Sequence, residues 1–339
     1  MERTMTDVTA ARAAARPQRR LDFQRMNEIG LLVVIALLYL AFYLYANNFL
    51  TFRNQVSILR DAATFGIAAW GATLIIVAGE IDISVGPMVA FLSVCFAFLL
   101  KSDDMPMVMA FLLTLVIGGA LGAIPGILRA VFDVPSFIGT LGLWSALGGL
   151  ALYFTDSVPV TIPANDFLDW LGGELFGLPI SALVMFVLFG VFVFISRKTA
   201  FGRSIFAIGG NASAAHLAGI KVRNIRVALF VIAGVLAAVT AILLTARNGV
   251  GDASVSRSGL EFSVISAVVV GGTALSGGRG SILGTLLGIF VISLIGNGLV
   301  LMGVNSYLQP VVSGVIIVAA VLLNILASRY GARRNRKGA

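Results

Sequence analysis

The sequence predicts an all-α, polytopic integral membrane protein with about ten transmembrane helices. Of its 339 residues, 58% are apolar and only 12% are charged, which is too little charge to cover a soluble domain of this length. Its 38 glycines do not end the long apolar runs, and a bilayer tolerates glycine in helices better than water does. Lys and Arg are concentrated in alternate predicted loops, as the positive-inside rule expects.

Ten apolar runs approach the length of about 20 residues that a helix needs to cross about 30 Å of hydrocarbon. The second, third and eighth runs are short or interrupted by glycine, so we expect eight to ten spans and prefer ten. The first run lacks a small-residue cleavage pattern, and we interpret it as a retained helix rather than a signal peptide. In chain order the runs occupy residues 30–46, 62–79, 85–100, 107–130, 136–153, 179–196, 226–246, 260–276, 281–302 and 307–327.

The excess of basic residues, a net charge of +8, determines the predicted orientation. With ten spans and a cytoplasmic N-terminus, the inside segments hold 19 of the 24 Lys and Arg residues, and the opposite orientation reverses this split. Both termini are therefore expected in the cytoplasm. The basic residues indicate membrane topology and attraction to anionic membrane lipids, and they give no support to nucleic-acid binding.

The predicted domain organisation has a single large unit. A cytoplasmic N-terminal tail of residues 1–29 precedes a transmembrane domain of residues 30–327, and a basic cytoplasmic C-terminal tail of residues 328–339 follows. Two loops are long enough to carry function: an acidic outer loop of residues 155–179 and a basic cytoplasmic loop of residues 197–226.

A weak internal repeat links the two halves of the chain. Gly79 to Gly86 follows one short span, and Gly272 to Gly278 closes another in the second half. Paired short or glycine-broken helices indicate the solute path in secondary transporters. A glycine-rich tight turn between any two helices gives the same pattern.

Four polar residues are candidates for a translocation pathway or gate. Glu80, Asp82 and Ser84 lie between two apolar runs with no Lys or Arg nearby in the sequence, and Asn297 lies within the ninth run. A charge at the bilayer centre costs several kcal/mol, so such residues normally face a cavity or the interface. The carboxylates either line the cytoplasmic end of a polar pathway for a hydroxylated solute or cap the next helix at the membrane surface, which position alone favours.

Other ionisable residues have simpler interpretations. Arg129 and Asp133 flank an inside turn, where they pair with each other or with lipid phosphates. Glu261 stands at the outer start of a span, where a carboxylate favours the helix N-terminus. The single histidine, His216, has no metal-ligating neighbour in the sequence, and the single cysteine, Cys95, cannot form a disulfide within the chain.

The cytoplasmic loop predicts a short exposed helix. Asn211 is a favourable N-cap, the next seven residues are mostly good helix formers, and Gly219 suits a C-terminal stop. Its small, alanine-rich surface fits a groove in a partner protein, or else the helix lies on the membrane surface. The residues that define this loop are Gly202, Arg203, Gly209, Asn211, Ala214, Ala215 and Gly219.

The sequence contains no motif for energy conversion or catalysis. It has no Gly-x-x-x-x-Gly-Lys-Ser/Thr loop for nucleotide phosphates, and no catalytic set can be assembled around one histidine. Ionisable residues of a proton relay are nearly missing from the spans. We therefore expect no enzyme activity, no catalytic or metal site and no cofactor in this chain, with energy for uphill transport supplied by a partner.

Four stretches in order resemble the ribose/xylose/arabinose-type permeases of bacterial ABC importers. The run Gly-Glu-Ile-Asp-Ile-Ser-Val-Gly at residues 79–86 is similar to their Gly-Gly-Ile-Asp-Leu-Ser-Val-Gly signature. Residues 134–142 are similar to a helix start of that family, residues 201–222 to its cytoplasmic loop, and residues 271–280 to its glycine-rich turn. The resemblance covers residues 30–327.

The resemblance implies an ABC importer permease fold and translocation of a monosaccharide, pentose or hexose, across the bacterial inner membrane. It further implies a permease homodimer, a periplasmic sugar-binding protein and a separate ATPase that binds ATP and Mg. The loop of residues 197–226 then becomes the coupling loop that docks on the ATPase. Glu80 stands where the family signature has glycine, so no family role transfers to it.

Two other classes of function compete with this interpretation. A stand-alone secondary transporter or channel for a small polar solute explains the broken helices, but it explains neither the coupling-like loop nor the scarcity of ionisable residues in mid-span. A membrane enzyme lacks a catalytic set. The sequence leaves the identity of the sugar open, and it offers the acidic loop of residues 155–179 as a candidate dock for the binding protein.

Overall fold

The computed structural model describes residues 18–102 and 105–305, together with single residues and pairs between 308 and 322. This part of the chain is mostly helical, which confirms the predicted polytopic membrane protein. Seven of its helices are long and apolar enough to cross a membrane. They are α2 (Gln18–Tyr45), α3 (Phe52–Val77), α5 (Met107–Val131), α6 (Ser136–Thr155), α8 (Ile180–Lys198), α11 (Val222–Asn248) and α13 (Ile282–Leu301).

Two further apolar helices are shorter, α4 (Val85–Lys101) and α12 (Leu260–Val270), and they coincide with the third and eighth predicted runs. Nine of the ten predicted runs therefore contain a helix. The tenth, residues 307–327, lies largely outside the described residues. So do most of the predicted N-terminal tail, in which α2 begins at Gln18, and all of the C-terminal tail.

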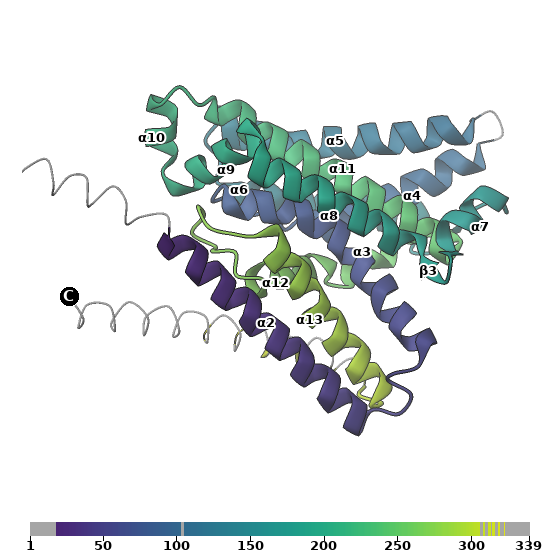
Figure 1. Ribbon diagram of the computed structural model, residues 1–339. Helices are drawn as coiled ribbons and strands as arrows, with labels where there is room; N and C mark the ends of the chain where they lie inside the picture. The colour runs from purple at the N-terminus through teal and green to yellow at the C-terminus, as the bar shows by residue number, and fades with distance from the viewer. Residues whose placement is uncertain are drawn as a thin grey trace, which may run out of the picture.

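Small elements mark the two ends of the helical bundle (Figure 1). The cytoplasmic loop forms α9 (Ala200–Gly210) and α10 (Ala212–Leu217) at one end. The opposite end carries α7 (Asp166–Gly172) and a hairpin of β2 (Glu174–Leu175) with β3 (Leu178–Pro179). A second antiparallel pair joins the acidic loop to the chain after α11, and a 3-10 turn follows that pair. These elements are β1 (Val160–Thr161), β4 (Val250–Gly251) and η1 (Ala253–Arg257).

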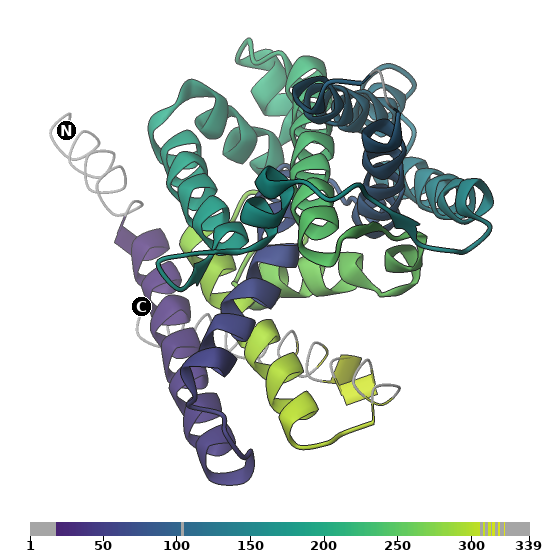
Figure 2. The ribbon, with the colours of Figure 1, turned by 90° about the vertical axis from the view of Figure 1, so that its right-hand side faces the viewer.

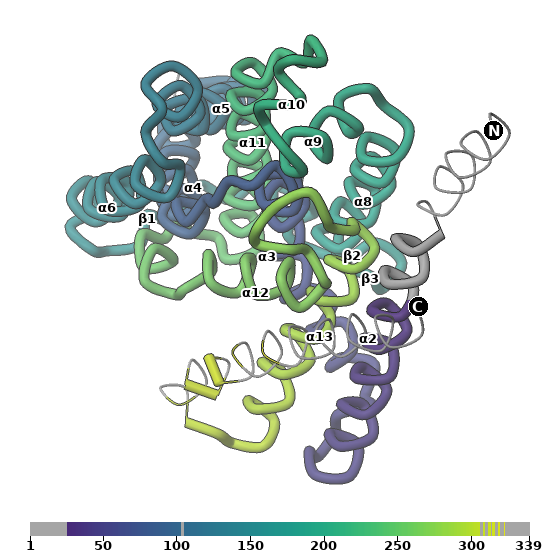
Figure 3. Tube along the Cα trace, turned by 90° about the vertical axis from the view of Figure 1, so that its left-hand side faces the viewer, coloured from purple at the N-terminus to yellow at the C-terminus, as the bar shows by residue number. Residues whose placement is uncertain are grey.

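Burial separates central from peripheral helices. In α3, 78% of the residues in its apolar membrane-crossing stretch are buried, and Trp70 is fully buried. In α2, α6 and α8, only 11%, 17% and 22% of the corresponding residues are buried. Seen from the end where α10 lies, α3 occupies the middle of the helical bundle (Figure 3). Exposed apolar faces on the peripheral helices are unfavourable in water and suit contact with lipid.

Helices α2 and α13 form a smaller group beside the main bundle (Figure 2). Phe42, Phe49, Ile58 and Leu294 make its core together with the start of α3. Polar contacts join α2 to the segment before α13. Asn27 Nδ2 donates to the carbonyl oxygen of Gly271 at 3.1 Å, and Ser281 Oγ donates to Glu28 Oε1 at 3.0 Å, while Ser281 also caps α13.

The packing of α5 on α11 depends on glycine. Gly118, Gly122 and Gly126 recur every fourth residue along α5 and face α11. A Cβ on Gly122 would lie 2.2 Å from the carbonyl oxygen of Phe230, and a Cβ on Gly234 would lie 2.0 Å from that of Gly118. Small residues let helix backbones approach closely in membranes, where lipid tails remove the hydrophobic drive for association.

We predict that Gly122→Ala destabilises the protein by about 1–3 kcal/mol, because the added methyl group forces α5 away from α11. The matched control is Gly190→Ala on α8, where a Cβ meets nothing within 4 Å. There the gain in helix propensity of about 0.5–1 kcal/mol leaves stability unchanged or raised. Thermal unfolding in detergent measures both variants. Equal midpoints for the two variants contradict the close-packing argument.

Candidate functional site

The connection between α3 and α4, residues 78–84, holds its polar side chains inside the protein, although Gly79 is exposed, and we call it the buried connection. Glu80, Asp82 and Ser84 are only 4%, 5% and 0% exposed. The backbone runs along the first turns of α6: the N–H of Ile81 donates to Ser136 Oγ at 3.1 Å. A further bond joins the N–H of Ile83 to Thr140 Oγ1 at 3.4 Å. The three side chains therefore do not lie on an open membrane surface.

Asp82 and Ser84 are bonded to each other. Asp82 Oδ1 accepts hydrogen bonds from the backbone N–H of Ser84 at 2.8 Å and from its Oγ at 2.6 Å. Burial raises the pKa of the Asp82 carboxyl in this connection between helices, and the two bonds from Ser84 oppose that change. Ser84 is the N-cap residue of α4, so the turn fixes where that helix begins. A pathway role for this pair stays a prediction.

Glu80 is held by two arginines that are remote in sequence. Arg129 Nε, in the last turn of α5, lies 2.9 and 3.0 Å from the two carboxylate oxygens of Glu80. Arg226 Nε, near the start of α11, lies 2.7 Å from Oε1, but its N–H is not directed at that oxygen. This second contact is an ion pair without a linear hydrogen bond. The connection is thereby tied to the ends of α5 and α11.

The predicted pairing of Arg129 with Asp133 is present but secondary. Its Nη1 lies 3.6 Å from Asp133 Oδ1, and the Asp133 side chain is 79% exposed. An exposed pair at this distance contributes little, whereas the buried carboxylate of Glu80 requires its partners. The contacts of Glu80 therefore tie three segments together, and a pathway role for Glu80 stays a prediction.

The cytoplasmic loop contains the predicted helix and an additional one. Asn211 Oδ1 accepts from the N–H of Ala214 at 3.0 Å to cap α10, and Gly219 follows it with φ of +85°. The additional helix, α9, is capped by Thr199, whose Oγ1 accepts from the N–H of Gly202 at 3.0 Å. A sequence signal for α9 was available: Thr199 precedes apolar residues at helical spacing, of which Ile205 is fully buried.

Three stretches that the sequence singles out meet backbone to backbone at this end of the bundle (Figure 3). A Cβ on Gly209, in α9, would lie 1.8 Å from the carbonyl oxygen of Val77, the last residue of α3. The same oxygen accepts from the N–H of Gly278 at 2.8 Å, and a Cβ on Gly277 would lie 2.9 Å from Gly79 Cα. We call these four glycines and Val77 the glycine junction. It joins the cytoplasmic loop to the buried connection and to the turn of residues 271–280.

The predicted coupling-loop residues divide into two groups. Gly202, Gly209 and Ala215 pack inward: Ala215 is 5% exposed, and a Cβ on Gly202 would lie 2.2 Å from the carbonyl oxygen of Ile195. The other residues are exposed, and they are Arg203, Asn211, Ala214 and Gly219. Leu217, which the sequence analysis did not select, is 87% exposed at the end of α10.

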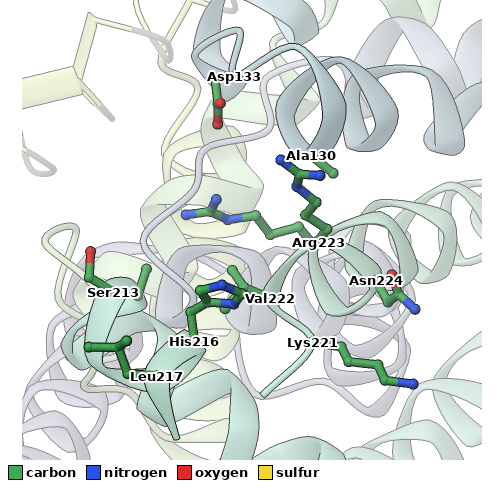
Figure 4. Close-up of a pocket in the computed structure, with 11 residues that line it drawn as sticks. Ala130, Asp133, Ser213, His216, Leu217, Lys221, Val222, Arg223 and Asn224 are labelled. Carbon is green, nitrogen blue, oxygen red and sulfur yellow. The ribbon is translucent and has the colours of Figure 1, made fainter. Parts of the chain in front are cut away.

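A basic pocket of about 740 Å³ lies beside α10 (Figure 4). His216 and Ser213 of α10 line one side, Asp133 the facing side, and Arg223 on the first turn of α11 lies between them. Lys221, Asn224, Arg226 and apolar residues complete the lining. Because Arg226 also contacts Glu80, the pocket adjoins the ion pairs of the buried connection. Its cations suit an acidic group of a partner.

Asn297 lies apart from the other three predicted pathway residues. It forms a reciprocal amide pair with Asn54 near the start of α3, with N–O distances of 2.9 and 3.0 Å. Asn54 Nδ2 also donates to the carbonyl oxygen of Phe49 at 2.9 Å. The pair ties α13 to α3, and a gating role for Asn297 stays a prediction.

Glu261 lies in the first turn of α12, where the sequence predicts a carboxylate that favours a helix N-terminus, but the sequence does not predict its burial. It is 1% exposed, and its Oε1 accepts from Trp144 Nε1 of α6 at 2.9 Å. An ionisable residue within an apolar run is a signal for function that the sequence does contain. Within the described residues, no three His, Cys, Asp or Glu side chains gather as a metal site.

Comparison with known proteins places this arrangement in a family. Residues 54–321 match the family model described as the permease component of the branched-chain amino acid transport system. The chain belongs to this permease family. The match includes the buried connection, the cytoplasmic loop and the turn of residues 271–280, so the resemblance found in the sequence is confirmed.

Relatives of this permease align with it over nearly its whole length. It is 62% identical over 313 residues to the probable ABC transporter permease protein YphD of Escherichia coli strain K12, covering 92% of this chain and 94% of that protein. It is 38% identical to the ribose import permease protein RbsC of Bacillus subtilis, with 91% and 96% covered. For the L-arabinose ABC transporter permease protein AraH of Azospirillum brasilense, identity is 34% and coverage is 100% and 97%. No solved structure matches the permease.

We predict that Glu80→Gln destabilises the permease by about 3 kcal/mol, because it leaves Arg129 and Arg226 without their buried counter-charge. Glu174→Gln is the matched control, since its ion pair with Arg60 is exposed, with side chains 41% and 27% accessible. That change costs about 0–1 kcal/mol. Thermal unfolding in detergent compares the two. A Glu80→Gln midpoint no lower than that of the control contradicts the structural role.

Proposed function

We propose that this permease is the membrane subunit of an ABC importer that carries a monosaccharide, pentose or hexose, across the bacterial inner membrane. The names of relatives aligned over almost the entire chain support a sugar as the solute. A separate ATPase subunit binds ATP and Mg, so this chain is not itself an enzyme. The observation that carries the proposal is the exposed α10, which follows directly on α9, where the backbone of Gly209 lies against the end of α3 beside the buried connection.

The ATPase docks on α9 and α10. Leu217 offers an apolar contact that is 87% exposed, and the adjacent pocket offers Lys221 and Arg223 to acidic groups. At an interface, an apolar centre with a charged rim supplies affinity and orientation. A membrane-surface helix is the other interpretation of α10. The position of α10 at the tip of the bundle (Figure 1), with a cavity beside it, favours protein docking.

Displacement of α10 is transmitted through the glycine junction. The backbone of Gly209 lies against the end of α3, and no side chain lies between them to absorb a small movement. Close-packed contacts of this kind transmit strain. Nucleotide binding to the ATPase and docking of a loaded binding protein then favour different states of the permease, and this difference in affinity gives the cycle its direction.

An ABC importer also contains a second permease copy and a binding protein. Two copies of the permease form the pathway, and both termini of each copy lie in the cytoplasm. A periplasmic sugar-binding protein docks at the end opposite α10. The acidic loop of residues 155–179, which carries Asp156, Asp166, Asp169 and Glu174, offers it a charged surface.

We predict that Leu217→Asp weakens binding of the ATPase about tenfold or more, a loss of about 1.4 kcal/mol or more, by placing a charge at the apolar contact. Phe176→Asp is the control, because Phe176 is 95% exposed at the opposite end of the bundle. The measurement is co-purification in detergent with the ATPase encoded in the same gene cluster. A variant that stays folded and binds like the wild type contradicts docking on α10. Sugar uptake by the chain alone in liposomes supports a stand-alone secondary transporter instead.

We predict that the two ends of the bundle face opposite sides of the membrane. In a Cys95→Ala background, Phe176→Cys reacts with a membrane-impermeant maleimide in intact spheroplasts, and Leu217→Cys reacts only after the membrane is opened. Both side chains are exposed, at 95% and 87%, so access depends on the membrane. The Cys95→Ala protein without an added cysteine gives the background level of labelling. Labelling of Leu217→Cys in intact spheroplasts reverses the proposed orientation.

A further inference from the structure

The carboxylate of Glu261 lies between the first turns of two short helices. It is the second residue of α12, and its Oε2 faces Gly86, the second residue of α4. A Cβ on Gly86 would lie 2.0 Å from Oε2, so only glycine fits at this contact. Partial positive charge at both helix N-termini favours an anionic group here.

One oxygen of this carboxylate is left without a hydrogen bond. Oε1 accepts from Trp144 Nε1 at 2.9 Å. Oε2 is buried and has no donor in the described part of the chain, although Glu261 is only 1% exposed. An unsatisfied buried acceptor costs about 1–3 kcal/mol, and more when it is charged. Arg129 and Arg226 pair with the other buried carboxylate, Glu80, and not with Glu261.

The helices that meet at this carboxylate are unusual in length. In the described residues, α4 and α12 are the apolar helices too short for a full span, and they belong to opposite halves of the chain. Paired interrupted helices whose N-termini point at the solute form the midplane sites of many transporters. Helix α4 packs against both α6, which carries Trp144, and α12 (Figure 3).

We propose that Glu261, Trp144 and the first turn of α4 form a contact site for the hydroxyl groups of a monosaccharide. The inference rests on the proposed function and names the point inside the membrane where the solute is recognised. As α4, α6 and α12 separate during the cycle, Oε2 accepts hydrogen bonds from sugar hydroxyls. The partly exposed Trp144 covers the apolar C–H face of the sugar, as aromatic side chains do in ligand sites.

The carboxylate of Glu261 favours a hydroxylated solute over an amino acid. A hydroxyl group donates to Oε2 of Glu261, while the indole N–H of Trp144 keeps its bond to Oε1. An ammonium group also donates to Oε2, so the discrimination comes from the carboxylate that accompanies it in an amino acid. A second carboxylate from an amino acid would be repelled by Glu261. One or two hydrogen bonds hold the sugar weakly enough for release.

The test is ¹⁹F NMR of the assembled importer labelled with 5-fluorotryptophan. The chain has three tryptophans, and Trp144→Phe assigns the relevant resonance in the permease. We expect D-ribose, D-xylose or L-arabinose at millimolar concentration to shift the Trp144 signal saturably, while Trp70 and Trp170 stay unchanged. L-leucine serves as the amino-acid probe. A shift with leucine and none with the sugars overturns the assignment of solute class.

The companion variant is Glu261→Gln, which replaces the open acceptor with an amide. We expect sugar affinity from the NMR titration and sugar uptake in liposomes to fall about tenfold, with ATPase binding unchanged. The matched control is Asp61→Asn, which changes an exposed carboxylate of α3 that is paired with Arg247.

If no sugar moves the Trp144 resonance in an importer that transports sugar, this site is wrong and the proposed function stands. If the wild-type permease neither binds an ATPase nor transports sugar, the proposed function is wrong as well. If Glu261→Gln fails to fold, the wild-type titration still decides.

Discussion

The organisation of this permease depends on backbone-to-backbone contact at the glycine junction. A Cβ at Gly209 or Gly277 would overlap neighbouring main chain, so the cytoplasmic loop, the buried connection and the turn before α13 hold one relative position. The carbonyl oxygen of Val77 reinforces it by accepting from Gly278. Because main-chain atoms have no rotamers, a shift of one segment displaces the others. The same principle brings α5 and α11 together through Gly122 and Gly234.

Two buried carboxylates have different hydrogen-bonding environments. Glu80 has both oxygens in contact with arginine, which ties α5 and α11 to the connection between α3 and α4. Glu261 has one oxygen bonded to Trp144 and the other facing a helix N-terminus without a donor. A satisfied buried charge adds rigidity, whereas an open acceptor retains capacity to bind.

Local patterns predicted the helices and the cytoplasmic loop well, because run length, capping residues such as Asn211 and glycine stops act within a few residues. They also identified the buried connection. What they missed depends on contacts between distant segments. No local pattern places Arg129 and Arg226 beside Glu80. The start of an apolar run gave the helix position of Glu261 but not its burial against α4 and α6. Helix α9 was missed although Thr199 marks its start.

The ion pairs of Glu80 constrain how this sequence can change. The residue replaces a glycine of the family signature, and it is tolerated because positions 129 and 226 both carry arginine. Loss of Glu80 leaves two arginines without their counter-charge, whereas loss of one arginine leaves Glu80 paired with the other. The carboxylate at position 80 and the arginines at 129 and 226 are therefore coupled through one shared ion-pair cluster. A chimera that joins Glu80 to segments with neither arginine buries an unpaired carboxylate.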